Sequence, residues 1–422
     1  MAEIIPFKGI LYNPEKVDAS ETMAPPYDIV THDRKDELYR KSPHNVIRID
    51  FGKDKDGDND EENRYTRASK CLTDWQQEGI LTQDPEPFFY CYEMSYKAEG
   101  KTLKTRGFLG AVKIEELGKG RIHPHEMTYS KPKSDRLNIL RICNANTSPI
   151  WSLYSSEEKA ASSILNDISK EKPFIEADLG DGAAHRLWKI TDSSLIEKIK
   201  EEMSDKDVFI ADGHHRYETA QAFKKEMEEK GLRKTGEEPF NYVLMFLSNM
   251  EDEGLSLLPT HRIVEIDSDI HPKEVLGEHF DVQKISSEGR SDDEVRREMF
   301  DMMQAKRHSF GMYLTNADTY YVLSFNGSIE ELDLPDCLKK LDVTVLHQFI
   351  FEKLLNIGHY EYEMAPDIAV ERANKGNFEA VFFLNNTEIQ DLKEVALAGH
   401  RMPPKSTYFY PKLLTGMVIY SF

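Results

Sequence analysis

The chain has 422 residues, of which 39% are hydrophobic, enough for about two or three domains with sizeable cores. Its 54 basic and 75 acidic residues give a net charge of −21, which repels DNA and RNA and favours a small-molecule enzyme. The sequence contains no run of about 18 apolar residues and does not begin like a secretory signal. Four distant cysteines without a CxxC pair disfavour a disulfide framework. We therefore expect a soluble cytoplasmic protein with no nucleic-acid or membrane partner.

The first half of the chain alternates between helical and extended patterns. The acidic segment 51–63 predicts a solvated loop, because its spacing lacks the glycine and glutamate of a calcium loop. Helical periodicity over 64–81 predicts a helix that ends near Gly79. Two aromatic-rich runs over 87–117 predict a β-hairpin with its turn at 98–101. In the middle, a strand at 208–211 is followed by a helix that ends near Gly231 and by a strand in 240–250.

The second half predicts a helix in 291–306, a hairpin over 308–327, a helix over 341–357, and strands near 377–386 and the C-terminus. Helices, strands and hairpins are interleaved, so the predicted class is α+β (mixed α/β). We expect an N-terminal and central region (1–265) that carries the active site. A helix-plus-hairpin insertion (266–330) and a C-terminal α/β region (331–422) would complete the fold.

The stretch IADGHHRYETA, residues 210–220, predicts a strand, a glycine turn and the start of a helix. The first backbone N–H groups of a helix have no internal partner and bind phosphate readily. Gly213 would let the backbone approach a ligand, and Arg216 would add a bidentate contact. His214 and His215 would donate to phosphate oxygens or to a transition state, which makes His215 a candidate catalytic residue. Asp212 would hold a magnesium ion or accept a proton. The alternative is that Asp212 caps the helix and that both histidines are surface residues.

A second charged constellation lies in residues 121–151. Its candidate residues are His123, His125, Glu126, Lys131, Lys133, Asp135 and Arg136. Ser134 or Asp135 would cap the helix that follows. The three basic residues form a local positive cluster in a very acidic chain, which favours an anionic ligand, and Glu126 is a candidate general base or magnesium ligand. A metal site that uses His123, His125, His214 and His215 is an alternative.

Three shorter pieces supply further candidates for substrate binding. Tyr27 and Asp28 follow two prolines in a rigid turn. The segment 257–264 places Thr260, His261 and Arg262 at the edge of a predicted strand. The segment 402–412 offers the anion-binding residue types Lys405, Ser406 and Thr407. A structural role is the alternative for each.

The motifs APPYD, PHEMTYSKPKSDR, ANTSPIW, ADGHHRYETA, LPTHR and MPPKSTYFYPKLLTG together resemble the prokaryotic family catalogued as domain of unknown function 1015. The ADGHHR segment also resembles the phosphate-binding turn of ParB-like and sulfiredoxin-like folds. Some members of that superfamily are kinases of free serine. This resemblance implies a ParB/sulfiredoxin-like core and a nucleotide-dependent phosphotransferase that uses ATP or ADP.

We therefore expect a magnesium-dependent kinase of a small hydroxyl metabolite, with free L-serine as the first candidate. Gly213, His214, His215 and Arg216 would hold phosphates, and Lys131, Lys133 and Arg136 would neutralise the transferring group. Asp212 would bind Mg²⁺ while Glu126 takes the hydroxyl proton, or the two acids would exchange these roles. A metal-dependent hydrolase and a non-catalytic nucleotide-binding module are the alternative functions. The oligomeric state and the phosphate donor stay open.

Overall fold

The computed structural model describes residues 2–98, 101–127, 130–267, 269–304, 306–328, 332–376 and 378–422. Contacts divide the chain into two compact units. Unit 1 contains residues 1–124, 128–256 and 411–422, and unit 2 contains residues 125–127 and 257–410. The division by sequence at residues 265 and 330 follows chain order and stays a prediction. The centre of the hairpin turn expected at 98–101 lies outside the described residues.

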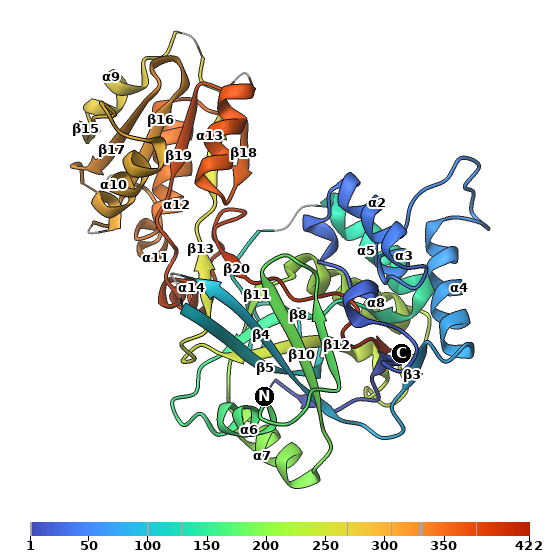
Figure 1. Ribbon diagram of the computed structural model, residues 1–422. Coiled ribbons are helices and arrows are strands. Elements are labelled where there is room, and N and C mark those ends of the chain that lie inside the picture. The colour runs from blue at the N-terminus through green and yellow to red at the C-terminus, as the bar shows by residue number, and fades with distance from the viewer. Residues whose placement is uncertain are drawn as a thin grey trace. The chain divides into compact units, whose positions relative to one another are not determined.

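Unit 1 is built on a nine-stranded mixed sheet (Figure 1). Its strands are β1 (Ile4–Ile5), β4 (Phe89–Ala98), β5 (Lys101–Lys113), β6 (Ile122–Pro124), β8 (Ile150–Tyr154), β9 (Ile175–Asp178), β10 (Ala183–Ile190), β11 (Val208–Asp212) and β12 (Tyr242–Asn249). The order is β6-β11-β8-β12-β5-β4-β10-β9, and β1 pairs with β5. The β11–β6 and β12–β8 pairs are parallel, and the others are antiparallel.

Helices supply the rest of unit 1. They are α1 (Ala19–Thr22), η1 (Tyr27–Ile29), α2 (His32–Lys41), α3 (Ile47–Asp50), α4 (Arg64–Gln77), α5 (Ser130–Cys143), α6 (Ala160–Ile168), α7 (Ser193–Met203), α8 (His214–Glu229) and η2 (Pro239–Asn241). One face of the sheet packs against α6, α7 and α8 through buried residues such as Leu165, Ile199 and Tyr217. Burial of this apolar face fixes the position of α8 beside β11.

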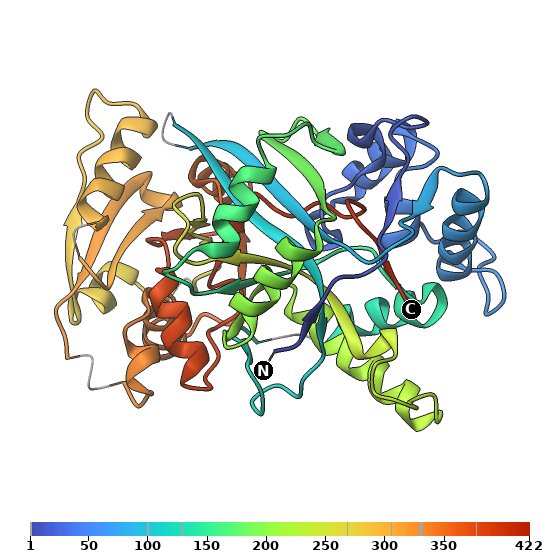
Figure 2. The same cartoon turned by 90° about the horizontal axis from the view of Figure 1, so that it is seen from below.

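Both ends of the chain lie in unit 1, as Figure 2 shows. Two small sheets fasten them: β2 (Ile10–Tyr12) pairs with β3 (Leu81–Gln83), and β7 (Ala145–Asn146) pairs with β21 (Tyr420–Ser421). Ile10 and Ile419 also exchange backbone hydrogen bonds of 2.9 Å. The C-terminal segment, residues 411–422, is therefore an integral part of unit 1.

Unit 2 has a six-stranded antiparallel sheet in the order β15-β17-β16-β19-β14-β18. The strands are β14 (His261–Val264), β15 (Phe280–Lys284), β16 (Ser309–Leu314), β17 (Thr319–Phe325), β18 (Tyr360–Glu363) and β19 (Ala380–Phe383). β13 (Ser256–Leu258) and β20 (Tyr408–Tyr410) pair in a separate two-stranded sheet. β13 begins at Ser256, where the chain passes from unit 1 into unit 2, and β20 ends at Tyr410, the last residue of unit 2.

The four inner strands of the unit 2 sheet (β17, β16, β19 and β14) are largely buried on both faces because helical segments cover both faces, whereas the edge strands β15 and β18 carry exposed or half-buried polar residues. The helical segments are α9 (Pro272–Gly277), α10 (Asp292–Gln304), η3 (Thr315–Ala317), α11 (Asp336–Lys339), α12 (Asp342–Thr344), η5 (Val345–Leu354), α13 (Pro366–Lys375) and α14 (Ile389–Leu397). Met299 of α10 and Val370 of α13 pack on one face. On the other face, Phe349 and Phe351 of the π-helical η5 contact Phe325 and Phe382 at ring distances of 5.6 and 5.2 Å.

The expected mixed α+β class is confirmed, and so are the hairpins over 87–117 and 308–327. The strand–glycine–helix element is also confirmed, with Tyr217, Ala220, Phe223 and Met227 buried on one side of α8. The expected cap at Ser134 or Asp135 is wrong, because α5 already begins at Ser130. The expected helix over 341–357 is π-helical over most of its length.

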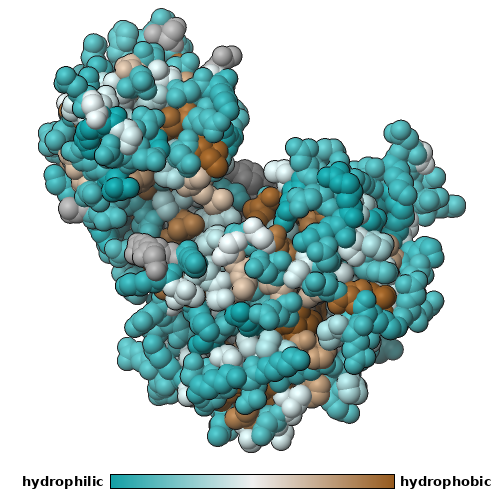
Figure 3. Space-filling view, in the orientation of Figure 1, coloured by the Kyte–Doolittle hydropathy of each residue, from teal (hydrophilic) through white to brown (hydrophobic). Residues whose placement is uncertain are grey.

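The face of the molecule drawn in Figure 3 is mostly hydrophilic, with small apolar patches, as the 31% content of charged residues leads one to expect. Across the described ranges, no helix combines the length and apolar character needed to cross a bilayer.

Candidate functional site

The end of β11 carries a carboxylate that is shared by two cations. Oδ2 of Asp212 lies 2.6 Å from Nη2 of Arg216, and Oδ1 lies 2.6 Å from Nζ of Lys412. The three side chains, which we call the Asp212 centre, are 19%, 11% and 10% exposed in that order. Among these three side chains, two positive charges face one negative charge at the N-terminal end of α8. The helix dipole adds further positive charge, so this end attracts anions.

Gly213 shapes the turn between Asp212 and α8. Its φ of 99° is a left-handed conformation that side chains disfavour, and it occupies the N-cap position of α8. A Cβ atom there would lie 2.9 Å from Nε of Arg216, because the arginine folds back over the turn. The expected alternative of a helix capped by Asp212 is therefore wrong, since Gly213 is the N-cap residue and Asp212 pairs with the two cations.

Arg216 is also anchored on its far side. Its Nη1 donates to Oγ of Ser148 at 2.8 Å and to the carbonyl oxygen of Pro149. These two residues directly precede β8, the antiparallel neighbour of β11. The guanidinium is thereby held in one orientation, with its charge directed at the carboxylate of Asp212.

The C-terminal segment brings Lys412 to the same place. The N–H of Leu414 donates to the hydroxyl of Tyr92 at 3.1 Å, and Nδ1 of the buried His185 lies 2.9 Å from that hydroxyl. The N–H of Thr415 donates to the carbonyl oxygen of Ala24 at 2.8 Å. Lys412 is thus positioned by contacts on residues that directly follow it.

The two adjacent histidines differ in exposure. His214, the first residue of α8, is 6% exposed, whereas His215 is half-buried. They point differently because consecutive helical residues are about 100° apart around the axis. Both stay predicted phosphate ligands, and His215 is the one with more contact to solvent.

A buried cluster that contains Arg136 lies close to the Asp212 centre, since Asp50, Arg136 and Arg216 line one small pocket. Its Nη1 is 3.1 Å from Oδ1 of Asp50, its Nη2 is 2.6 Å from Oδ2 of Asp135, and its guanidinium lies 4.0 Å from the ring centre of Tyr27. Burial raises the pKa of Tyr27 to about 12, so its hydroxyl is protonated at neutral pH. Asp28, the next residue, is exposed.

The predicted basic cluster of 131–136 does not present three available cations to a ligand. Arg136 is 6% exposed and faces two carboxylates, and Lys133 forms an ion pair with Glu218. The side chain of Lys131 lies outside the described part. Arg136 therefore has the placement of a structural cation, and phosphate contacts of the two lysines stay predictions.

The remaining candidates lie in unit 2. Nε2 of the fully buried His125 is 2.9 Å from Oγ1 of Thr407. Oε1 of Glu126 accepts the backbone N–H of Lys405 at 3.0 Å. Thus Glu126 and Asp212, the two predicted acid–base or magnesium residues, belong to different units.

His261 and Arg262 begin β14, and both are buried. Nε of Arg262 donates to Nε2 of His347 at 2.9 Å, and Nη2 donates to the carbonyl oxygen of Lys405 at 3.1 Å. Burial, with a smaller effect of Arg262, lowers the pKa of His261 to about 3. His261 therefore has the placement of a neutral packing residue.

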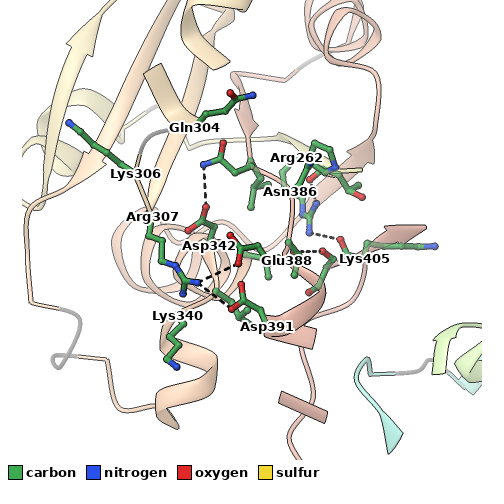
Figure 4. A pocket seen from close by; sticks show the side chains of 18 of the residues that line it. Arg262, Gln304, Lys306, Arg307, Lys340, Asp342, Asn386, Glu388, Asp391 and Lys405 are labelled. Carbon is green, nitrogen blue, oxygen red and sulfur yellow. Dashed lines mark hydrogen bonds and ion pairs between the residues drawn. The ribbon is translucent and has the colours of Figure 1, made fainter. Parts of the chain in front are cut away.

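Arg262, Lys405 and Ser406 line a pocket of about 490 Å³ in unit 2 (Figure 4). Thr260 also contributes to its wall. The structure thus brings together, in one place, three of the residues predicted to bind a substrate from two sequence segments more than a hundred positions apart.

A metal centre made of histidines is not formed. Nε2 of His123 lies 3.0 Å from Oδ1 of Asp207, and its ring stacks on Phe209 at 5.3 Å. Within the described ranges, no group of three or more His, Cys, Asp or Glu side chains is placed to hold a metal ion. The described residues thus give no support to the alternative site of His123, His125, His214 and His215.

Sequence reasoning missed Lys412 and Ser148. Both lie in motifs that were noticed, MPPKSTYFYPKLLTG and ANTSPIW, but neither residue type has a diagnostic spacing from Asp212. Their contacts with the Asp212 centre arise only when β8 and the C-terminal segment are placed beside β11.

A family model described as "Protein of unknown function (DUF1015)" matches residues 4–344. The match covers most of the chain, so the chain belongs to this family. No curated protein matches it.

Three solved structures share a distant likeness. A conserved hypothetical protein from Pyrococcus furiosus has 14% identity and a TM-score of 0.34, over 69% of this chain and 89% of its own. A free serine kinase in complex with AMP has 13% identity and a TM-score of 0.35, over 72% and 98%. SbnI with a C-terminal truncation, from Staphylococcus aureus, has 12% identity and a TM-score of 0.35, over 73% and 87%.

Proposed function

We propose that this member of the DUF1015 family is a nucleotide-dependent phosphotransferase that acts on a small hydroxyl metabolite, with free L-serine as the first candidate. The observation that carries the proposal is the Asp212 centre, in which Arg216 and Lys412 share one carboxylate at the start of α8. Phosphoryl transfer mostly requires positioning and neutralisation of negative charge, and this arrangement supplies both.

The nucleotide, ATP or ADP, would place its terminal phosphates at the N-terminal end of α8. There the first N–H groups of the helix and the half-buried His215 would donate to phosphate oxygens. Arg216 and Lys412 would exchange part of their contact with Asp212 for contact with phosphate. The geometry favours this exchange because each cation shares its carboxylate with the other.

Asp212 gains a role from the same exchange. A carboxylate that no longer neutralises two cations can accept a proton from the substrate hydroxyl or hold Mg²⁺. A magnesium ion would rest mainly on the nucleotide phosphates, with Asp212 as its protein ligand, because Mg²⁺ commonly takes one or two carboxylates and several waters. When bound, the ion would neutralise charge on the transferring phosphoryl group.

Substrate binding in unit 1 would use Tyr27 and Asp28. The charges of Arg136 and Arg216 both act to lower the pKa of Tyr27, against the larger effect of burial. The exposed Asp28 can accept a hydrogen bond from an ammonium or hydroxyl group. The alternative base, Glu126, is testable by the Glu126→Gln substitution, which removes the charge and keeps the shape.

The direct test is incubation of the purified chain with ATP or ADP, Mg²⁺ and L-serine, followed by detection of O-phosphoserine. Arg216→Met and Lys412→Met should each abolish product formation. Lys225→Met is the matched control, since Lys225 lies on α8 with a side chain that is 77% exposed. The proposal fails if no amino acid or small alcohol causes nucleotide consumption.

A nucleotide-binding module without catalysis predicts a different result. Calorimetry would then show that ADP binding depends on Arg216 and Lys412, while none of the acceptors is phosphorylated. This outcome would retain the phosphate site and reject the transferase.

A further inference from the structure

The pocket in unit 2 has a volume typical of small-molecule sites, about 490 Å³ against a common range of roughly 300–1,000 Å³. It is walled by the start of β14, the end of α10 and the residues that follow it, α12 and the residues before it, the residues between β19 and α14 with Asp391 of α14, and Lys405 and Ser406. All of these residues belong to unit 2. The pocket is therefore complete within one unit, and its ligand is independent of the reaction proposed for unit 1.

The lining of the unit 2 pocket contains more basic than acidic side chains, which is unusual for this acidic chain. Five basic side chains line it: Arg262, Lys306, Arg307, Lys340 and Lys405. Three carboxylates accompany them: Asp342, Glu388 and Asp391. Lys340 also pairs at 3.1 Å with Glu394, which lies outside the lining, so the lining together with this partner has a formal excess of one positive charge in a protein whose net charge is −21. A local excess of this sign attracts anions.

The basic groups are arranged on two sides of the pocket. Figure 4 shows Lys306, Arg307 and Lys340 spread along one side and Arg262 and Lys405 on the other, with the ends of Lys306 and Lys405 directed away from the centre of the pocket. Arg307 is 53% exposed and lies 3.5 Å from Asp391 and 3.9 Å from Glu388. These are loose ion pairs, so an anion can displace them at low cost.

Arg262 differs from the exposed cations because its side chain is held in place. It is 1% exposed as a residue, donates to His347 at 2.9 Å, and lies 4.7 Å from the ring centre of Tyr362. A guanidinium held by an imidazole and an aromatic ring keeps its orientation without a ligand, which lowers the entropic cost of binding one.

The remaining lining suits an organic molecule rather than a bare ion. Pro259, Phe300, Leu341, Val343 and Leu384 provide apolar contact. Gln304, Asn385 and Asn386 provide amide groups. Burial raises the pKa of Asp391, an effect that Arg307 partly offsets, so this acid competes less with an anionic ligand as the pH falls.

We propose that unit 2 binds a small organic anion in this pocket, with its phosphate or carboxylate group on Arg307 and the neighbouring lysines. The carboxylates and amides of the pocket then receive the hydroxyl or amine donors of the same ligand. This gives the protein a second small-molecule site that is separate from the Asp212 centre.

The experiment is titration calorimetry of the full chain without nucleotide. Glycerol 3-phosphate is the phosphate probe, L-malate is the carboxylate probe, and inorganic phosphate tests for a bare ion. We expect one organic probe to bind, and the tighter one identifies the anionic group. The double variant Lys306→Met/Lys340→Met should weaken its binding about tenfold, which corresponds to a contribution of about 1.4 kcal/mol from the two charges together.

Controls assign the binding to this pocket. Arg290→Met changes an arginine of unit 2 that pairs with Glu298 away from the pocket lining, and it should leave affinity unchanged. Both substituted lysines are exposed, so the double variant should keep the thermal midpoint of the parent. Arg307→Met provides a second variant with the same expected loss.

Three results would overturn the proposal. Neither organic probe binds, or inorganic phosphate binds as tightly as the better organic probe, or binding is lost in Lys412→Met and retained in the pocket variants. The last result would assign the anion to unit 1. Failure of serine phosphorylation has no bearing on these outcomes, because no nucleotide or transfer is involved.

Discussion

Nζ of Lys412 lies 2.6 Å from Oδ1 of Asp212, although 200 positions separate the two residues in the chain. The pair joins the C-terminal segment to the end of a central strand. One charged group of the candidate site therefore comes from the C-terminal segment. This segment is held in place by its contacts with Ala24, Tyr92 and β7. The site therefore forms only when the C-terminal segment is packed against these parts of unit 1.

Replacement of Lys412 by methionine should weaken the binding of ADP or inorganic phosphate to the chain. A charge-assisted hydrogen bond contributes about 1.5–3 kcal/mol, so the expected loss of affinity is about tenfold or more. Calorimetric titration measures it, with Lys225→Met as the exposed control on α8. Equal affinities of the two variants would show that Lys412 serves only to neutralise Asp212.

Replacement of Asp212 by asparagine should have opposite effects on binding and on turnover. Without the carboxylate, the charges of Arg216 and Lys412 repel each other more strongly, and an added phosphate relieves this repulsion. We expect tighter binding of inorganic phosphate, loss of phosphoserine formation, and a decrease in stability of about 3 kcal/mol, as for other partly buried pairs that lose one partner.

The measurements are phosphate titration and urea unfolding with and without phosphate. We expect added phosphate to restore stability to Asp212→Asn, because the anion takes the place of the lost carboxylate. Weaker phosphate binding in this variant would contradict a phosphate site at the Asp212 centre.

Much of the local fold could be predicted from sequence, since local patterns determine it. The Asp-Gly pair after an apolar run and the stripe through Tyr217 and Phe223 correctly predicted β11, its turn and α8. The long aromatic strands correctly predicted β4 and β5. These features depend on alternation and on the φ requirement of a single glycine, which neighbouring residues reveal.

The tertiary partners of the charged residues could not be predicted in this way. Arg136 looked like a phosphate ligand because it lies in a basic run, yet it is buried against Asp50, a residue 86 positions away. His261 looked like a substrate contact but packs inside unit 2. A sequence shows which side chains carry charge, whereas long-range pairing decides which of them remain exposed to solvent.

The stability of the protein should fall as the pH decreases from about 6.5, because three buried histidines resist protonation. Burial lowers the pKa of His185, His261 and His347 to about 3. The unfolded chain binds a proton at each below about pH 6.5, whereas the folded chain does not. The stabilisation is therefore complete above that pH and is lost as the pH falls toward 3, by about 1.4 kcal/mol per pH unit for each histidine.

His347→Gln tests the contribution of one group. Glutamine can accept the hydrogen bond from Nε of Arg262 but does not titrate. Urea unfolding at about pH 7, 6 and 5 should give a shallower decrease for the variant, by the slope of one proton. Parallel curves for variant and parent would mean that His347 is protonated in the folded protein despite its contact with Arg262.

A comparison of Gly213→Ala and Gly231→Ala should separate backbone strain from the close approach of Arg216. Both glycines have positive φ, 99° and 72°, at the two ends of α8. An alanine Cβ at 231 meets no atom within 4 Å, whereas at 213 it lies 2.9 Å from Nε and 3.0 Å from Cζ of Arg216. Both substitutions should cost about 1 kcal/mol of folding stability through their conformation.

Only Gly213→Ala should also displace the guanidinium and weaken phosphate binding, by about tenfold if one charge-assisted contact is lost. Phosphate titration of the two variants, after thermal unfolding has shown that both are folded, measures the difference. Equal phosphate affinities would mean that Arg216 can leave its place over the turn without consequence, and that the anion is held by Lys412 and the helix N–H groups instead.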